Sequence, residues 1–203
     1  TWMKVPGDPR NHYLARMEWA ESSEELHLQQ LNRLQNTNRV MLANARDGEV
    51  KTVYTDRDDA WIEVRFGFTK WIDKGSRFTY VSEREGWRQV YLVSREGMAV
   101  QKVTGGKYDV IRVLKIDEAN QWLYFIASPD NATQRYLFRI NLDGKELMQL
   151  SPSGQIGSHS YNISPDAKWA VHTFSSFAFP PISNLIRLPS HEIVRTLEEN
   201  QAL

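Results

Sequence analysis

The sequence lacks several features that would point to particular classes of protein. It contains no cysteine, which excludes disulfide bonds and thiol chemistry in this chain and leaves its compartment open. Its 25 basic and 25 acidic residues cancel, so no excess of positive charge favours binding to nucleic acid or to an anionic membrane. No apolar run approaches the roughly 18 residues of a membrane-spanning helix. We therefore expect neither a nucleic-acid partner nor a transmembrane segment here.

Patterns that would hold a nucleophile or a metal ion are also missing. The chain has no Gly-x-Ser-x-Gly motif, and Ser158 and His159 are neighbours that a strand would point to opposite faces. The five histidines form no zinc-binding spacing, and we expect His27 and His172 to be hydrogen-bonded structural residues. The acidic run 56–59 lacks the alternating ligands and central glycine of a calcium loop, so we expect a solvated turn. We predict no catalytic residue, metal or cofactor.

What the sequence does contain is a segment that occurs four times. Apolar residues that open the repeats lie 52, 44 and 47 residues apart, and apolar residues that close them lie 50, 47 and 47 apart. A period of about 40–50 residues with several short strands per unit is typical of the blades of a β-propeller. The opening residues are Leu26, Phe78, Trp122 and Trp169, and the closing residues are Val53, Val103, Leu150 and Leu197.

Within a repeat, the residue pattern favours antiparallel strands joined by tight turns. Apolar and polar residues alternate over 78–82 and 136–140, as in half-buried strands. Glu85-Gly86 and Asp143-Gly144 supply the glycines that such turns use, because glycine adopts positive φ without a steric clash. The fold class is therefore all-β, a β-propeller fragment of about four blades, each a four-stranded antiparallel sheet.

We place the blade-like repeats at about 12–56, 61–105, 108–153 and 158–203, so that the partial propeller covers 1–203. Because closed propellers have about four to eight blades, four is at the lower limit. We interpret the chain as a piece of a longer protein, and a complete four-bladed propeller is the alternative.

Several long strings resemble the propeller domain of dipeptidyl peptidase IV-type serine peptidases, which belong to the prolyl oligopeptidase family. The resemblance extends over essentially the whole chain. The strings that carry it span 12–19, 28–36, 82–91 and 194–203.

This resemblance implies a role and a partner. In the family, an eight-bladed propeller precedes an α/β-hydrolase domain with a Ser-Asp-His triad, and the enzyme removes N-terminal dipeptides with Pro or Ala second. The chain would then be the C-terminal half of the propeller. It would gate and orient peptide substrate and support its own downstream hydrolase domain. The resemblance also implies a periplasmic or secreted protein.

Two loops are candidates for contacts outside the propeller. A family loop that contributes a Phe-Arg pair to the substrate cleft corresponds to 61–68, where Trp61, Arg65 and Phe66 are the candidates, although the order here is Arg-Phe. The alternative is that Trp61, Phe66 and Phe68 pack between blades. The Pro-rich stretch 177–182 cannot form a regular hairpin, so Phe177 and Phe179 are candidates for contact with the hydrolase domain.

Two other functions remain open from the sequence. A stand-alone propeller that binds peptides or proteins without catalysis has the same fold. A propeller glycosidase would need two facing carboxylates, and no acidic pair here has that pattern. Unpaired edge strands also predict that the isolated fragment either self-associates, as a homodimer formed by edge pairing, or is unstable at high concentration.

Overall fold

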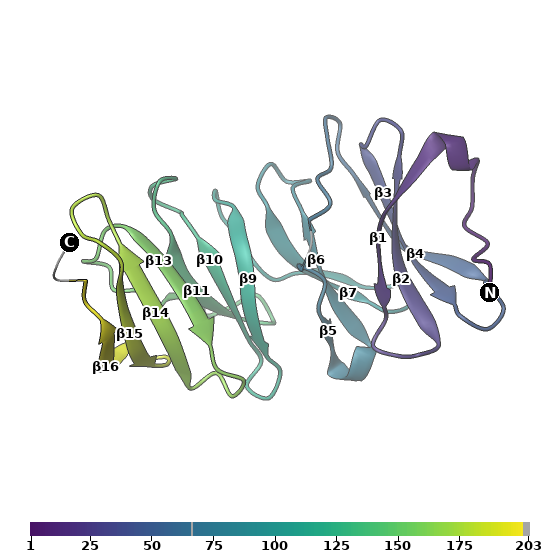
Figure 1. Cartoon of the computed structure of the whole chain (residues 1–203). Helices are drawn as coiled ribbons and strands as arrows, with labels where there is room; N and C mark the ends of the chain where they lie inside the picture. The colour runs from purple at the N-terminus through teal and green to yellow at the C-terminus, as the bar shows by residue number, and fades with distance from the viewer. Residues whose placement is uncertain (66, 201–203) are drawn as a thin grey trace. The chain divides into compact units, whose positions relative to one another are not determined.

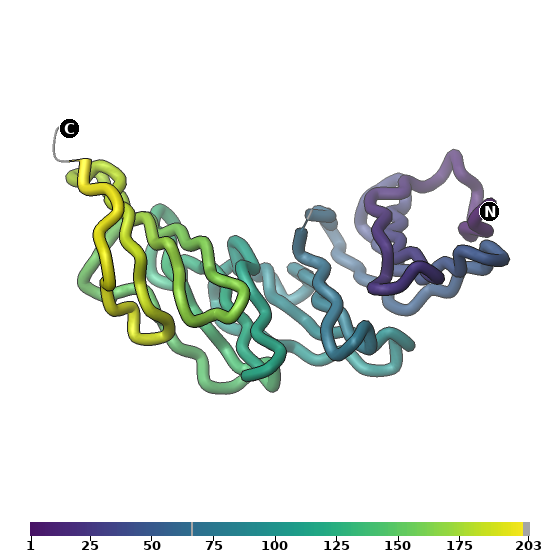
Figure 2. The backbone as a smooth tube through the Cα atoms, turned by 60° about the horizontal axis from the view of Figure 1, so that its bottom comes forward, coloured from purple at the N-terminus to yellow at the C-terminus, as the bar shows by residue number. Residues whose placement is uncertain are grey.

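The computed structural model describes residues 1–65 and 67–200 and consists almost entirely of β-strands (Figure 1). It divides into two compact units, Thr1–Lys102 and Val103–Leu203. Each unit contains two four-stranded antiparallel sheets, and the strands of each sheet follow one another in the sequence. In the backbone trace, segments of similar colour lie together, because the strands of each sheet are consecutive in the sequence (Figure 2). The expected all-β architecture of four-stranded blades is confirmed.

The first unit holds two sheets and two short 3-10 helices, η1 (Pro9–Asn11) and η2 (Asp73–Gly75). The strands of its first sheet are β1 (His12–Trp19), β2 (Glu25–Asn32), β3 (Thr37–Asn44) and β4 (Val50–Arg57). Those of its second sheet are β5 (Trp71–Ile72), β6 (Arg77–Ser82), β7 (Gln89–Ser94) and β8 (Val100–Lys102).

The second unit repeats this arrangement. The strands of its first sheet are β9 (Val110–Asp117), β10 (Trp122–Ala127), β11 (Tyr136–Asn141) and β12 (Met148–Gln149). Those of its second sheet are β13 (Ser158–Ile163), β14 (Trp169–Ser175), β15 (Ile182–Arg187) and β16 (Glu192–Glu198). Among the described residues, no helix is long and apolar enough to cross a membrane.

In each unit, the core lies between the two sheets. In the first unit, Val40 and Val53 of the first sheet pack in one cluster with Phe78 and Val93 of the second. In the second unit, a corresponding cluster joins β10 and β11 to β13, β14 and β15. Alternation along each strand therefore buries one set of side chains against the neighbouring sheet. The packing of the two sheets therefore determines where the loops that connect their strands reach the surface of the unit.

A tight turn brings the two sheets of the first unit into close contact. The turn between β7 and β8 contains Gly97, whose φ is 74°. A Cβ atom at this glycine would lie 1.8 Å from the backbone oxygen of Val53 in β4, so only glycine fits. The tight turn that joins β7 to β8 therefore also contacts β4 of the neighbouring sheet.

Candidate functional site

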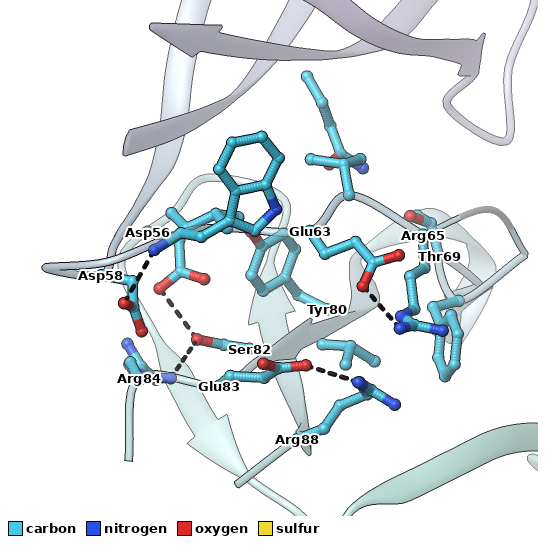
Figure 3. A pocket seen from close by; sticks show the side chains of 16 residues that line it. Asp56, Asp58, Glu63, Arg65, Thr69, Tyr80, Ser82, Glu83, Arg84 and Arg88 are labelled. Atoms are coloured by element: carbon cyan, nitrogen blue, oxygen red, sulfur yellow. Dashed lines mark hydrogen bonds and ion pairs between the residues drawn. The ribbon is translucent and has the colours of Figure 1, made fainter. Parts of the chain in front are cut away.

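A pocket in the first unit lies where the connection between its two sheets meets the turn after β6 (Figure 3). The connection supplies Trp61, Glu63 and Arg65, and β4 and β6 supply the polar side chains beneath them. The pocket is therefore built from an irregular loop placed over the ends of two sheets. Its lining residues are Gln29, Asp56, Asp58, Trp61, Ile62, Glu63, Val64, Arg65, Phe68, Thr69, Tyr80, Val81, Ser82, Glu83, Arg84 and Arg88.

The loop over the pocket is held by its own sequence and by backbone contacts. The side-chain oxygen Oδ1 of Asp58 accepts hydrogen bonds from the backbone nitrogens of Ala60 (2.8 Å) and Trp61 (3.3 Å). An aspartate that bonds the backbone two and three residues ahead is a common turn former. Further along, the Ile62 nitrogen donates to the Gln35 oxygen at 2.7 Å, and Arg16 Nη2 donates to the Val64 oxygen at 2.9 Å. The first sheet therefore anchors the loop.

The floor of the pocket is a buried polar network. Asp56 is only 3% exposed, and its Oδ1 accepts a hydrogen bond from Ser82 Oγ at 3.0 Å. Asn38 Nδ2 donates to Gln29 Oε1 at 2.9 Å and to the Tyr80 hydroxyl at 3.0 Å. Burial raises the pKa of the Asp56 carboxyl, while hydrogen bonds from Ser82 and Tyr80 oppose this shift. Burial also raises the pKa of Tyr80 well above its ordinary value.

The rim of the pocket carries ion pairs. Arg65 Nη2 lies 2.6 Å from Glu63 Oε2, and Arg88 Nη2 lies 2.7 Å from Glu83 Oε1. Arg84 donates to the Tyr54 hydroxyl at 2.6 Å, and burial raises the pKa of that tyrosine to about 12. The site thus offers carboxylates and guanidinium groups, which can hydrogen-bond the polar backbone of a peptide.

The structure places the predicted loop residues in different surroundings. Trp61 and Arg65 both line the pocket, whereas Phe66 lies outside the described residues. Trp61 is 54% exposed, so it is not a core residue between blades. Phe177 and Phe179 lie in the second unit, in the loop before β15, where their side chains are exposed. The structure brings Trp61 and Arg65 into one site.

The floor of this pocket was not predicted from the sequence. We expected the run 56–59 to be a solvated turn, which is wrong for Asp56 because this residue lies within β4, next to its last residue, and is buried against Ser82 of the neighbouring sheet. One feature of the sequence could have indicated that Asp56 is buried. It lies near the end of an alternating strand pattern, two residues after the buried Tyr54. Among the described residues, there is no group of three or more His, Asp or Glu side chains that could hold a metal ion.

A second polar cluster lies in the second unit and contains three histidines. His159 Nε2 donates to the Gln155 oxygen at 2.8 Å, and His159 Nδ1 lies 2.9 Å from His172 Nε2. The Tyr161 hydroxyl lies 2.9 Å from His191 Nε2. Burial lowers the pKa of His172 to about 3, and the neighbouring histidines add to the shift. The cluster is a packed, neutral part of the blade, which agrees with the structural role expected for His172.

His27, one of the two histidines of the first unit, behaves differently. His27 in β2 is fully buried, and neither of its ring nitrogens has a hydrogen-bond partner among the described residues. Its Nδ1 lies 3.5 Å from Glu18 Oε1, and its ring packs edge-on against Phe78. Burial lowers its pKa to about 4. The expectation of a hydrogen-bonded His27 is therefore wrong, because Trp71 and Phe78 pack against the ring and the nearby Glu18 carboxylate forms no hydrogen bond with it.

Successive four-stranded antiparallel sheets, with a loop pocket at the ends of two of them, define a β-propeller fragment. Residues 1–181 match the family model described as the dipeptidyl peptidase IV (DPP IV) N-terminal region. The chain belongs to this family.

Individual relatives agree with the family match. The chain is 23% identical over 206 residues to the "Probable dipeptidyl peptidase 4" of Emericella nidulans, covering 97% of this chain and 26% of that protein. It is 20% identical over 208 residues to the dipeptidyl peptidase 4 of Trichophyton rubrum, covering 100% of this chain and 27% of that protein. The crystal structure of Porphyromonas gingivalis dipeptidyl peptidase 4 matches with a TM-score of 0.87 and 25% identity, covering 98% of this chain and 28% of that one. The chain thus spans about a quarter of the length of these relatives.

Proposed function

We propose that this chain is the non-catalytic propeller segment of a serine exopeptidase that releases N-terminal dipeptides with Pro or Ala second. The observation that carries the proposal is the family match over residues 1–181. The relatives named above are dipeptidyl peptidases, and the chain itself contains no Gly-x-Ser-x-Gly motif. In this proposal, the segment gates and orients the peptide and supports an α/β-hydrolase domain further along the polypeptide.

The exposed surface of loop 58–65, which lies over this small pocket of about 30 Å³, is the part of the chain that we assign to the peptide. The exposed ring of Trp61 offers an apolar surface, and Arg65 offers hydrogen-bond donors for a peptide carbonyl. Arg65 already pairs with Glu63, and an exposed pair of this kind contributes little to stability. A peptide carbonyl can therefore take one of the Arg65 donors at small cost.

An assay with Gly-Pro and Ala-Pro chromogenic amides tests the overall function. We expect hydrolysis by a longer polypeptide that includes the next domain and none by the 203-residue chain alone. Inactivity of a well-folded longer polypeptide would contradict the proposal and favour the alternative, a stand-alone propeller that binds peptides or proteins.

Variants of the active longer polypeptide test the role of the loop. We expect Trp61→Ala and Arg65→Gln to raise KM while kcat changes little, because these residues bind the peptide away from the reacting bond. Trp87→Ala is a matched control, since Trp87 is also exposed and lies outside the pocket lining. An unchanged KM in both loop variants would remove the loop from substrate binding. Export to the periplasm or the medium, and self-association through edge strands, stay predictions.

A further inference from the structure

One face of the first sheet changes from apolar to polar along its length. Near one end, Leu28 and Met41 pack together beneath Met3 and Val5 of the N-terminal segment. The same face continues to Gln30, Arg39 and Arg57, because directly paired residues of antiparallel strands point to one side. Two rows of paired residues cross this polar end. They are His12, Asn32, Thr37 and Arg57 in one row and Leu14, Gln30, Arg39 and Thr55 in the other.

The N-terminal segment covers the polar end without filling it. The buried Gln30 amide donates from Nε2 to the Pro6 oxygen at 2.8 Å, which fixes the segment above the sheet. Between the segment and the sheet lies a cavity of about 270 Å³. Its lining residues are Pro6, Gly7, Asp8, Asn11, His12, Gln30, Asn32, Thr37, Arg39 and Arg57. This volume is just below the usual range for small-ligand pockets, about 300–1,000 Å³.

The charges that line the cavity are unbalanced. Its one carboxylate, Asp8, is engaged by Arg10, whose Nη2 lies 2.8 Å from Asp8 Oδ2. Arg39 donates from Nη1 to Gln30 Oε1 at 3.3 Å, a neutral acceptor, and no carboxylate among the described residues pairs with Arg39 or Arg57. Two guanidinium groups therefore line one cavity together with a single carboxylate, which already pairs with Arg10.

We propose that this cavity binds a carboxylate. A guanidinium group presents a planar fork of N–H donors that matches the two oxygens of a carboxylate. Arg39 and Arg57 supply this charge from neighbouring strands, and the Asn11 side chain and the His12 ring supply further polar groups. The ligand is a free small carboxylate or an acidic side chain of the longer polypeptide. The site lies apart from the pocket that we assign to peptide substrate, and none of its residues lines that pocket.

Titration of the 203-residue chain with glutarate tests the proposal. The observables are the chemical shifts of the Arg39 and Arg57 Nε–H groups and, in every variant, of the backbone amides of Gly7, Asn11 and His12 in ¹H–¹⁵N NMR spectra. We expect saturable shifts of the Arg39 and Arg57 signals, and at least tenfold weaker binding by Arg39→Gln/Arg57→Gln. Arg39→Lys/Arg57→Lys keeps both charges but lacks the planar fork, so we expect it to bind more weakly than the unaltered chain. Arg46→Gln is the matched control, because Arg46 pairs with Glu24 outside the cavity and its loss leaves binding unchanged.

Two matched probes decide the chemistry of the ligand. Glutaramide has the same carbon skeleton without charge, and inorganic phosphate is a tetrahedral oxyanion. Equal shifts with glutaramide, tighter binding of phosphate than of glutarate, or undiminished binding by the double Gln variant would each overturn the proposal. A linear, unsaturable response to glutarate would overturn it as well.

The same titration of the longer polypeptide separates the two sources of carboxylate. Saturable binding of glutarate by both proteins supports a free ligand. Binding by the 203-residue chain alone, with the Arg39 signal of the longer polypeptide already at its bound position, supports an acidic side chain of the polypeptide itself.

Discussion

Ser82 Oγ lies 3.0 Å from Asp56 Oδ1 and so joins the second strand of one sheet to the last strand of the sheet before it. Both residues are buried, and they are 26 positions apart in the sequence. The bond therefore connects two blades at the floor of the candidate peptide pocket. It links the stability of the first unit to the shape of that pocket.

Removing the donor of this bond is expected to destabilise the first unit. Ser82→Ala leaves a buried carboxylate without one of its partners, which costs about 1–3 kcal/mol of unfolding free energy. Urea unfolding followed by tryptophan fluorescence measures this difference. Asp59→Asn is the control, because Asp59 is an exposed neighbour. A Ser82→Ala variant as stable as the control would show that the bond does not hold the sheets together.

The unpartnered ring of His27 is expected to lower stability. His27→Leu has a similar volume and no polar atoms to leave unsatisfied, so we expect it to raise the free energy of unfolding by about 1 kcal/mol. His27→Asn keeps a buried polar group and should be less stable than His27→Leu. Equal stability of these two variants in urea unfolding would contradict the account of an unsatisfied ring.

The same burial predicts a loss of stability in acid. The pKa of His27 is lowered to about 4 and that of His172 to about 3, whereas an unfolded histidine titrates near 6.5. As the pH falls from about 6.5 to 4, the unfolded chain binds protons that the folded chain does not. The free energy of unfolding then decreases by up to about 1.4 kcal/mol per pH unit for each histidine. Urea unfolding between pH 7 and pH 4 measures this slope, and His27→Leu should reduce it for the first unit. A slope that His27→Leu leaves unchanged would assign the acid sensitivity to other groups.

The close approach of the β7–β8 turn to β4 predicts a difference between two glycines. Gly97 and Gly86 both have positive φ, but a Cβ at Gly86 would meet nothing within 4 Å. Both alanine variants carry backbone strain, and only Gly97→Ala adds a clash with the Val53 oxygen. We expect Gly97→Ala to cost at least about 1 kcal/mol more than Gly86→Ala in thermal or urea unfolding. Equal costs would mean that the turn moves freely away from β4.

The exposed loop before β15 is expected to contact another domain. Phe177 is fully exposed and Phe179 is 57% exposed, and large apolar side chains together on a surface often mark an interface. We expect Phe177→Ser/Phe179→Ser to leave the 203-residue chain as stable as before and to lower the activity or thermal stability of the longer polypeptide. Unchanged activity and stability of the longer polypeptide would remove this loop as an interdomain contact.

The sequence predicted the repeating framework because that framework rests on local patterns. Leu26, Phe78, Trp122 and Trp169 all lie in the second strand of their sheets, as the spacing required. Tryptophan positions alone were less informative, since Trp19 and Trp71 lie in first strands. Glu85-Gly86 and Asp143-Gly144 form the expected turns, because glycine chemistry determines them over a few residues.

The candidate site was less predictable because contacts between distant residues build it. The burial of Asp56 depends on Ser82 and Tyr80 of another sheet, which no local pattern indicates. The pairing of Arg65 with Glu63 depends on the path of an irregular loop. His27 lies in an alternating strand like His172, and only its neighbours leave it without a hydrogen bond.

The backbone oxygen of Gln155 determines which ring nitrogens of His159 and His172 carry a proton. A carbonyl only accepts, so His159 carries its proton on Nε2 and leaves Nδ1 bare. His172 must then carry its proton on Nε2, which leaves its own Nδ1 bare, and that atom has no partner among the described residues. One peptide oxygen thus selects a single tautomer for two rings, with His172 Nε2 donating to His159 Nδ1 and His159 Nε2 donating to the Gln155 oxygen. The pair is a short hydrogen-bond chain with a fixed direction, and reversing it would require both rings to exchange protons together.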